Sequence, residues 1–315
     1  MTHDTTITRE AITRAALRIA PFVRRTPVME VMVEGVALPV TLKLELFQHA
    51  GSFKARGAFN TLVNAEAGAA GVATASGGNH GAAVAYAARQ LGYKARIFVP
   101  EIASPAKVAR IASYGAEIVQ KGATYNDALG YCNAHIAATG AVSVHAYDAV
   151  PTLEGQGTLA RELEDQAPGI DTLLVAVGGG GLIGGIAAWY RSRVKLVGVE
   201  PSTCNTLHAA FAAGERVAIT PSGLAADSLG STTVGALMFG IARDHIANVV
   251  LVSDDDIRDA QRHLWRELQL VTEPGGAAAF AALLSGAYKP EGDERVGAVI
   301  CGANTSMDVF GKLFG

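Results

Sequence analysis

The chain has 315 residues, of which 50% are apolar, 17% charged and 6% aromatic. This hydrophobic content excludes an intrinsically disordered protein, and the length predicts about two domains. The formal net charge is −3, and lysine and arginine are scattered along the chain. No basic stripe therefore indicates binding to nucleic acid or to an anionic membrane surface.

Three cysteines, Cys132, Cys204 and Cys301, are too few for a disulfide framework and form no CxxC pair. Their scarcity fits a reducing compartment, and the polar N-terminal residues 1–10 lack the apolar core of a signal peptide. We therefore expect a cytoplasmic protein. Residues 172–190 carry no charge, but four consecutive glycines, Gly178–Gly181, interrupt them. This run predicts a buried strand, a glycine loop and a helix start rather than a membrane span.

Short β-branched runs alternate with alanine-rich helical patterns along most of the chain. The first part predicts strands at 41–45, 71–75, 96–99, 117–120 and 142–145, with helices at 55–65, 79–91, 105–114 and 125–138. The second part predicts strands at 172–177, 195–200, 249–253 and 296–301, with helices at 152–165, 182–191, 254–268 and 277–285. The alternation predicts an α/β fold with two lobes of open, mostly parallel sheet flanked by helices.

The predicted elements also suggest where the lobes divide. Residues 46–148 hold four consecutive βα units and predict a small domain, whereas residues 1–45 and 149–315 predict a large one. Two lobes of open α/β sheet imply a ligand-binding cleft at the carboxyl ends of the strands.

A lysine stands at a predicted helix start in the segment Gly51–Ala58, which reads GSFKARGA. A helix dipole disfavours a cation at that place, and a positive environment lowers the pKa of an amine and makes it a nucleophile. Lys54 is therefore a candidate catalytic residue. The alternative is a surface lysine that follows a turn.

Three further segments follow predicted strands: Ser76–Gly81, Gly178–Gly185 and Cys301–Ser306. Backbone N–H groups of glycine loops at helix starts can bind an anion. Helix capping and tight packing are the alternatives for the two glycine loops, and an inert core cysteine is the alternative for Cys301. A nicotinamide dinucleotide site is weakly supported, because the next acidic residue after Gly178–Gly185 is Glu200, at the end of the next strand.

Together and in this order, the four segments resemble the serine/threonine dehydratase group of tryptophan-synthase-β-like enzymes, which use pyridoxal 5′-phosphate (PLP). The match runs from Leu44 to Asn304. The resemblance implies PLP fold type II, a large PLP-binding domain and an active site in the cleft between the lobes.

The resemblance also implies roles for individual residues. Lys54 matches the catalytic lysine that bonds covalently to the cofactor. Phe53 matches a residue that packs on the ring, Asn79 one that binds the ring oxygen, and Cys301 one that faces the ring nitrogen. The remaining cofactor-binding positions are Gly178, Gly179, Gly180, Gly181 and Leu182, for the phosphate, and Glu273, at the ring edge. The positions for the substrate carboxylate are Ser76, Gly77, Gly78, Asn79 and His80.

Two departures from the family pattern bear on function. Relatives with racemase activity carry a serine where this chain has Gly77. Some relatives bind a divalent cation near the strand that ends at Glu200, but Thr206 stands here where the second acidic ligand is expected. With one carboxylate lost, we expect no metal site. The role of Asp227, in a segment similar to a family Ala-Asp-Gly-Leu, stays open.

The residues therefore predict dehydrative deamination of a hydroxy amino acid such as L-threonine or L-serine. A neutral thiol at the ring nitrogen weakens the electron sink, which suits β-elimination. The alternatives are an amino-acid racemase, a dehydratase of another 3-hydroxy amino acid and a non-catalytic ligand-binding relative. We expect a homodimer or a higher homo-oligomer that binds a small-molecule substrate and neither nucleic acid nor membrane.

Overall fold

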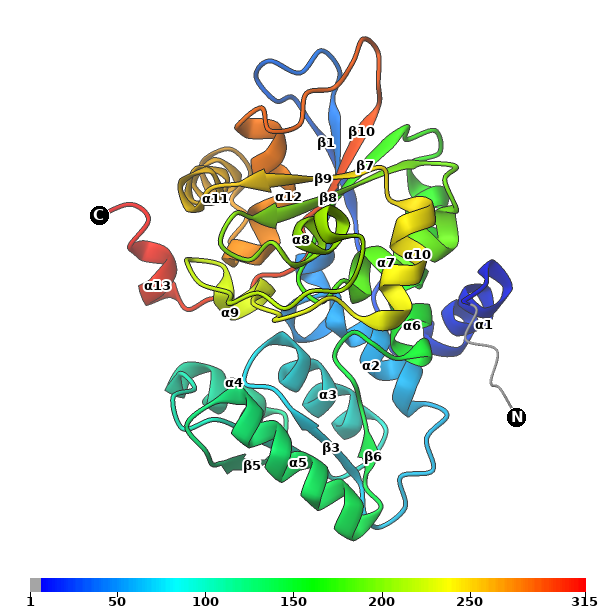
Figure 1. Cartoon of the computed structure of the whole chain (residues 1–315), viewed down its shortest axis with the longest axis vertical. Helices are drawn as coiled ribbons and strands as arrows, with labels where there is room; N and C mark the ends of the chain where they lie inside the picture. Colours follow the sequence, from blue (N-terminus) through cyan, green and yellow to red (C-terminus); the bar gives the residue numbers. More distant parts are fainter. Residues whose placement is uncertain (1–6) are drawn as a thin grey trace.

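The computed structural model describes residues 7–315, which form two lobes (Figure 1). Residues 1–6, the start of the polar N-terminal segment, lie outside the described residues. The strands are β1 (Val28–Val31), β2 (Val40–Lys43), β3 (Val72–Ala75), β4 (Ala95–Val99), β5 (Glu117–Gln120), β6 (Val142–Ser143), β7 (Thr172–Ala176), β8 (Lys195–Pro201), β9 (Asn248–Val252) and β10 (Val296–Val299).

The helices surround two separate sheets. They are α1 (Arg9–Ile19), α2 (Lys54–Leu62), α3 (Asn79–Gln90), α4 (Pro105–Ser113), α5 (Tyr125–Thr139), α6 (Val150–Gln166), α7 (Gly181–Tyr190), α8 (Thr206–Ala213), α9 (Ala226–Leu229), α10 (Ala236–His245), α11 (Asp254–Leu268), α12 (Pro274–Leu284) and α13 (Met307–Gly311), with short 3₁₀ turns at Glu45–Phe47 and His49–Gly51. No helix within residues 7–315 is long and apolar enough to cross a bilayer.

The predicted α/β fold with two parallel-rich sheets is confirmed. Six strands form one sheet in the order β1-β2-β10-β7-β8-β9, and four form the other in the order β5-β4-β3-β6. All strand pairs are parallel except β1 with β2. Every predicted strand is present, with ends that differ by up to two residues from the sequence prediction. The domain boundaries themselves stay a prediction.

Parallel strands place the site. β2, β7 and β10 lie in the six-stranded sheet and run in the same direction, so their carboxyl ends meet at one edge. The segments that follow them carry Lys54, the glycine loop and Cys301. β3, in the other sheet, leads into the Ser76–Gly81 segment and α3. In Figure 1 the smaller sheet with α3, α4 and α5 lies below the larger sheet, and α2 and α6 lie where the two lobes meet.

Helix α7 is buried along its whole length, which its sequence GLIGGIAAWY explains. It packs closely against α6, because glycines on both helices let the backbones approach. A Cβ at Gly185 would lie 2.6 Å from the Gly157 nitrogen and would also overlap the Leu153 carbonyl oxygen. Both obstacles are backbone atoms of α6, which cannot move independently of the helix.

We therefore expect Gly185→Ala to lower the free energy of unfolding by at least about 1–3 kcal/mol, as overpacked cores do. Gly240→Ala is the matched control, since Gly240 lies in α10 with no atom within 4 Å of an added Cβ. That control should raise stability by up to about 1 kcal/mol through helix propensity. Urea unfolding followed by circular dichroism measures both, and equal effects would contradict the close α6–α7 approach.

Candidate active site

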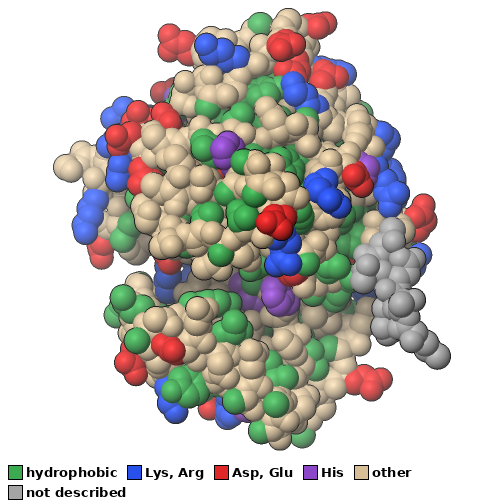
Figure 2. All heavy atoms as spheres, in the orientation of Figure 1, with side chains coloured by type: hydrophobic (Ala, Val, Ile, Leu, Met, Phe, Trp, Pro, Cys, Tyr) green, Lys and Arg blue, Asp and Glu red, His purple; other side chains and the backbone are tan. Residues whose placement is uncertain are grey.

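A cavity with an empty volume of about 480 Å³ lies among the segments that follow β2, β3, β7 and β10. Figure 2 shows the furrow between the two lobes, with histidine side chains visible inside it. The cavity is lined by all ten residues predicted to bind the cofactor, namely Phe53, Lys54, Asn79, Gly178, Gly179, Gly180, Gly181, Leu182, Glu273 and Cys301. These residues are thus brought together from five separate parts of the sequence.

Lys54 is the first residue of α2. The residues that follow β10 fix the position of Lys54. Ser52 forms a β-bridge with Gly302, and the Phe53 N–H donates to the Cys301 carbonyl at 3.2 Å. The Lys54 ammonium donates to the Ala146 carbonyl at 2.7 Å.

The Lys54 amine is easier to deprotonate than an ordinary lysine. Burial lowers its pKa from 10.5 to about 8, although Cys301 and Glu273 act in the opposite direction. The sequence predicted a lowered pKa but assigned it to a positive environment at the helix start. Desolvation is the main cause instead. At neutral pH a useful fraction of the amine is already unprotonated and can act as a nucleophile or a base.

The glycine loop Gly178–Gly181 packs so tightly that side chains are excluded. A Cβ at Gly179 or Gly181 would overlap Tyr147, and one at Gly180, whose φ is +85°, would overlap Met238. Within residues 7–315, no acceptor pairs with the N–H groups of Gly178–Leu182. These unpaired N–H groups line the cavity at the start of α7, an arrangement that binds phosphate in many proteins.

Asn79 and Cys301 line the cavity at other points. The Asn79 amide nitrogen donates to Glu273 Oε1 at 2.5 Å, and Glu273 is only 5% exposed. Burial raises the pKa of Glu273, opposed by Asn79 and by nearby Lys107. The Cys301 thiol donates to the Gly275 carbonyl at 3.3 Å, and burial raises the pKa of this thiol. Cys301 therefore stays neutral across the physiological range.

Of the predicted substrate-binding residues, 76–78 form the turn between β3 and α3, and Asn79 and His80 begin α3. Gly77, Gly78 and Asn79 line a second cavity, whereas the hydroxyl of Ser76 accepts from the Gly78 N–H at 3.3 Å. The ring of His80 points away, toward Thr74 and the Val144 carbonyl. Burial lowers the pKa of His80 to about 3, so this ring is neutral and only its backbone N–H faces the turn.

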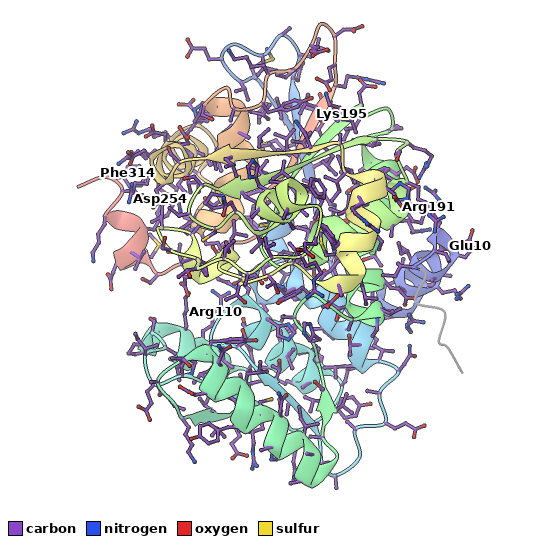
Figure 3. The ribbon with its side chains drawn as sticks, in the orientation of Figure 1. Glu10, Arg110, Arg191, Lys195, Asp254 and Phe314 are labelled. Carbon is purple, nitrogen blue, oxygen red and sulfur yellow. The ribbon has the colours of Figure 1, made fainter. Side chains whose placement is uncertain are left out.

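The second cavity adjoins the first and has an empty volume of about 1160 Å³. The two share Asn79, Ser228 and Glu273 in their linings. At this cavity, Lys107 of α4 forms an ion pair with Asp227 of α9. The pair connects the two lobes. It also gives a structural contact to Asp227, whose role was open from the sequence. Figure 3 shows Arg110 of α4 extending into the space where the lobes meet.

Glu200 lies at the end of β8, where relatives were expected to hold a cation. Its carboxylate accepts from the Thr206 hydroxyl at 2.9 Å and from the N–H groups of Leu207 and His208 at 2.8 Å. Glu200 thus caps α8. Burial raises its pKa to about 7, and these three hydrogen bonds act against that rise. The Thr206 hydroxyl also contacts the Gly178 carbonyl at 2.8 Å.

Among the residues that line the catalytic cavity but were not predicted as site residues are Tyr147 and Ser228. The Tyr147 ring covers the glycine loop, and the Ser228 hydroxyl accepts from the Gly275 N–H at 3.0 Å. Neither lies in a recognisable motif. For Ser228 a signal existed, since it replaces a glycine in the segment that resembles Ala-Asp-Gly-Leu.

Comparison with known families identifies the family of the chain. The family model described as "Pyridoxal-phosphate dependent enzyme" matches residues 19–302. The chain belongs to this family. Family members use pyridoxal 5′-phosphate, and the cavity fits that group. The unpaired N–H groups of the glycine loop suit its phosphate, and the Lys54 amine suits its aldehyde.

Several relatives within the family have names. The phenylserine dehydratase of Ralstonia pickettii is 37% identical over 97% of this chain and 95% of its own length. The catabolic L-threonine dehydratase of Escherichia coli (strain K12) is 34% identical over 91% of this chain and 89% of its own. Among solved structures, maize serine racemase superposes with a TM-score of 0.92, covering 98% of this chain and 96% of its own, at 33% identity. Both dehydratases and racemases are thus similar to this chain.

The contacts of Glu200 generate a prediction for metal binding. Thr206→Asp places a second carboxylate beside Glu200, so we expect it to lower the free energy of unfolding by about 1–3 kcal/mol through repulsion and the lost Gly178 contact. Added Mg²⁺ or Ca²⁺ should restore the melting temperature of this variant, because two carboxylates suit a hard cation. Thr206→Val, which lacks the charge, is the control and should not respond to cations. A cation-dependent melting temperature in the unsubstituted protein would contradict the hydroxyl-capped arrangement.

Proposed function

We propose that this protein removes water from a hydroxy amino acid such as L-threonine or L-serine and releases a 2-oxo acid and ammonia, with PLP as cofactor. The observation that carries the proposal is the combination of the Lys54 amine with the side-chain-free Gly77. The amine can take the proton from the substrate Cα. Gly77 has no side chain, so this position offers no acid that could return a proton to the other face of Cα.

We assign different cavity residues to different parts of the cofactor. When bound, PLP supplies an electron-withdrawing ring that stabilises negative charge at the substrate Cα. We assign the covalent bond to Lys54 and the phosphate to the N–H groups of Gly178–Leu182. Phe53 would pack on the ring, Asn79 would donate to the ring oxygen, and the neutral thiol of Cys301 would face the ring nitrogen.

We assign binding of the substrate carboxylate to the segment that joins β3 to α3. The Ser76 hydroxyl and the N–H groups of Gly77–His80 lie at or just before the start of α3, so we assign them to the substrate carboxylate. The neutral Lys54 amine, freed when the substrate amine takes its place on the cofactor, would then take the proton from Cα. A neutral thiol at the ring nitrogen holds a positive charge there less well than a carboxylate does. Negative charge at Cα is therefore short-lived, which favours prompt loss of the β-hydroxyl.

A second candidate substrate class is a hydroxy amino acid with a larger substituent on Cβ. The second cavity supports this candidate, since its empty volume of about 1160 Å³ exceeds what the methyl group of threonine needs. Similarity to the phenylserine dehydratase of Ralstonia pickettii supports it too. A panel of L-serine, L-threonine and β-phenylserine, scored by release of the 2-oxo acid, distinguishes the two classes.

Product analysis tests elimination against racemisation. We expect L-serine and L-threonine to give 2-oxo acid with little D-serine or epimer, because a positioned acid contributes roughly 10²–10⁴-fold to rate. Gly77→Ser should raise exchange of the Cα proton on the second face. The backbone tolerates this change, since an added Cβ meets the Ala103 side chain at 3.4 Å and no positive φ is involved. D-serine formed from L-serine at a rate comparable with pyruvate release would instead establish a racemase.

The low pKa of Lys54 predicts how the apoprotein takes up its cofactor. Only the neutral amine attacks an aldehyde, so the uptake rate should rise with pH, with a midpoint near 8 rather than 10.5. Stopped-flow absorbance at several pH values measures this dependence. Lys54→Ala should lose both covalent uptake and elimination activity, and retention of either would remove Lys54 from its assigned role.

A further inference from the structure

Three polar side chains form a linked chain at the edge of the catalytic cavity. The amide nitrogen of Asn304 donates to the Ala50 carbonyl at 2.8 Å and to Asn79 Oδ1 at 2.5 Å. The amide nitrogen of Asn79 in turn donates to Glu273 Oε1 at 2.5 Å. Asn304 lies just beyond β10, close to Cys301, and is not among the residues assigned above to the cofactor or the substrate.

The direction of this chain is fixed at its Ala50 end. A backbone carbonyl can only accept a hydrogen bond, so it requires the amide nitrogen of Asn304. Both hydrogens of that nitrogen are then used, and the second requires the oxygen of Asn79. Turning Asn304 over would set its oxygen against the Ala50 oxygen. The Asn79 nitrogen is therefore left facing Glu273, with one hydrogen still free.

The position of Asn304 has two unfavourable features, a buried oxygen without a donor and a neighbouring glycine with positive φ. Its own oxygen, Oδ1, is buried, and no group within residues 7–315 donates to it. Gly51 has a φ of +72°, and a Cβ there would overlap Asn304 Oδ1 and lie 2.8 Å from an Arg110 nitrogen. A buried acceptor without a partner is rare in folded proteins and calls for an explanation. The explanation that we infer is that Asn304 is held in this position because it orients the side chain of Asn79.

We propose that Asn304 is a positioning residue, which orients the Asn79 amide so that its nitrogen, and not its oxygen, faces the ring oxygen of the cofactor. The proposal rests on the cofactor role assigned to Asn79 under the proposed function. Asn304 acts through Asn79 and touches neither cofactor nor substrate in this assignment. Glu273 completes the arrangement by accepting the first hydrogen of the Asn79 nitrogen, which leaves the second for the ring oxygen.

The test uses holoenzyme variants, with cofactor affinity and the absorbance spectrum of the bound cofactor as readouts. Asn304→Ala removes the donor, and Asn304→Asp keeps the shape but replaces the donor by an acceptor. Loss of one oriented hydrogen bond to the cofactor should weaken its binding about 5- to 150-fold. The absorbance maximum and its pH dependence should change in both variants. Thr305→Ala is the matched control, since within residues 7–315 the Thr305 hydroxyl donates to the Ser306 carbonyl and to no residue of the Asn304–Asn79–Glu273 chain, and it should leave both readouts unchanged.

A double-mutant cycle separates positioning from a merely structural role. In an Asn79→Ala background, Asn304→Ala should add less than about twofold to the loss of cofactor affinity, because its effect passes through Asn79. Additive effects, or an unchanged spectrum in both Asn304 variants, would overturn the proposal. Thermal unfolding of each variant verifies folding, and Asn304→Asp serves if Asn304→Ala is unstable. Failure of the proposed function is a distinct result, since the unsubstituted protein would then lack elimination activity.

Discussion

A cluster of buried charges holds the start of α2, and with it Lys54, in place. This buried charge cluster consists of Lys43, Glu45, Arg56 and Glu162, whose side chains are at most 11% exposed. Arg56 donates to both oxygens of Glu45, at 2.9 and 2.7 Å, and to Glu162 at 3.0 Å. Lys43 donates to Glu162 at 2.5 Å. The cluster therefore joins β2, the following 3₁₀ turn, α2 and α6.

The position of Arg56 explains why the cluster matters for the site. Arg56 lies two residues after Lys54 on α2, so fixing Arg56 fixes the start of that helix. Burial alone would raise the pKa of Glu45, but the Arg56 guanidinium lowers it, so both groups remain charged. Loss of one partner from such a buried pair leaves an uncompensated charge, which typically destabilises a protein by about 3–5 kcal/mol. The cluster thus ties catalytic geometry to overall stability.

Much of the fold and site could be predicted because parallel strands carry a strong signal and meet at one edge. Lys54, the glycine loop and Cys301 each follow a strand of the six-stranded sheet, so their convergence follows from topology, whereas Asn79 follows β3 of the other sheet. Other features depend on tertiary paths that no local pattern encodes. The contact between Asn79 and Glu273 joins residues 194 positions apart, and the Tyr147 ring reaches the glycine loop from an irregular connection.

The sequence analysis predicted neither β1 nor α1, and the physical reasons differ. β1 is a four-residue edge strand that is only partly buried, so alternation of apolar and polar residues is too short to detect. α1, in contrast, had a readable signal, since Thr8 caps it and Ala11, Ile12, Ala15 and Ile19 form its buried face. The cause of the low Lys54 pKa was also out of reach, because burial of one side chain depends on the packing of both lobes.

The Thr206 hydroxyl anchors the glycine loop through a group of the polypeptide itself. This hydroxyl connects Glu200 to the carbonyl of Gly178, the first residue of the loop. A loop anchored through a diffusible ion loosens whenever the free concentration of that ion falls, by mass action. An anchor that is part of the polypeptide cannot dissociate. The contact between the Thr206 hydroxyl and the Gly178 carbonyl therefore needs no diffusible ion to hold the first residue of the loop.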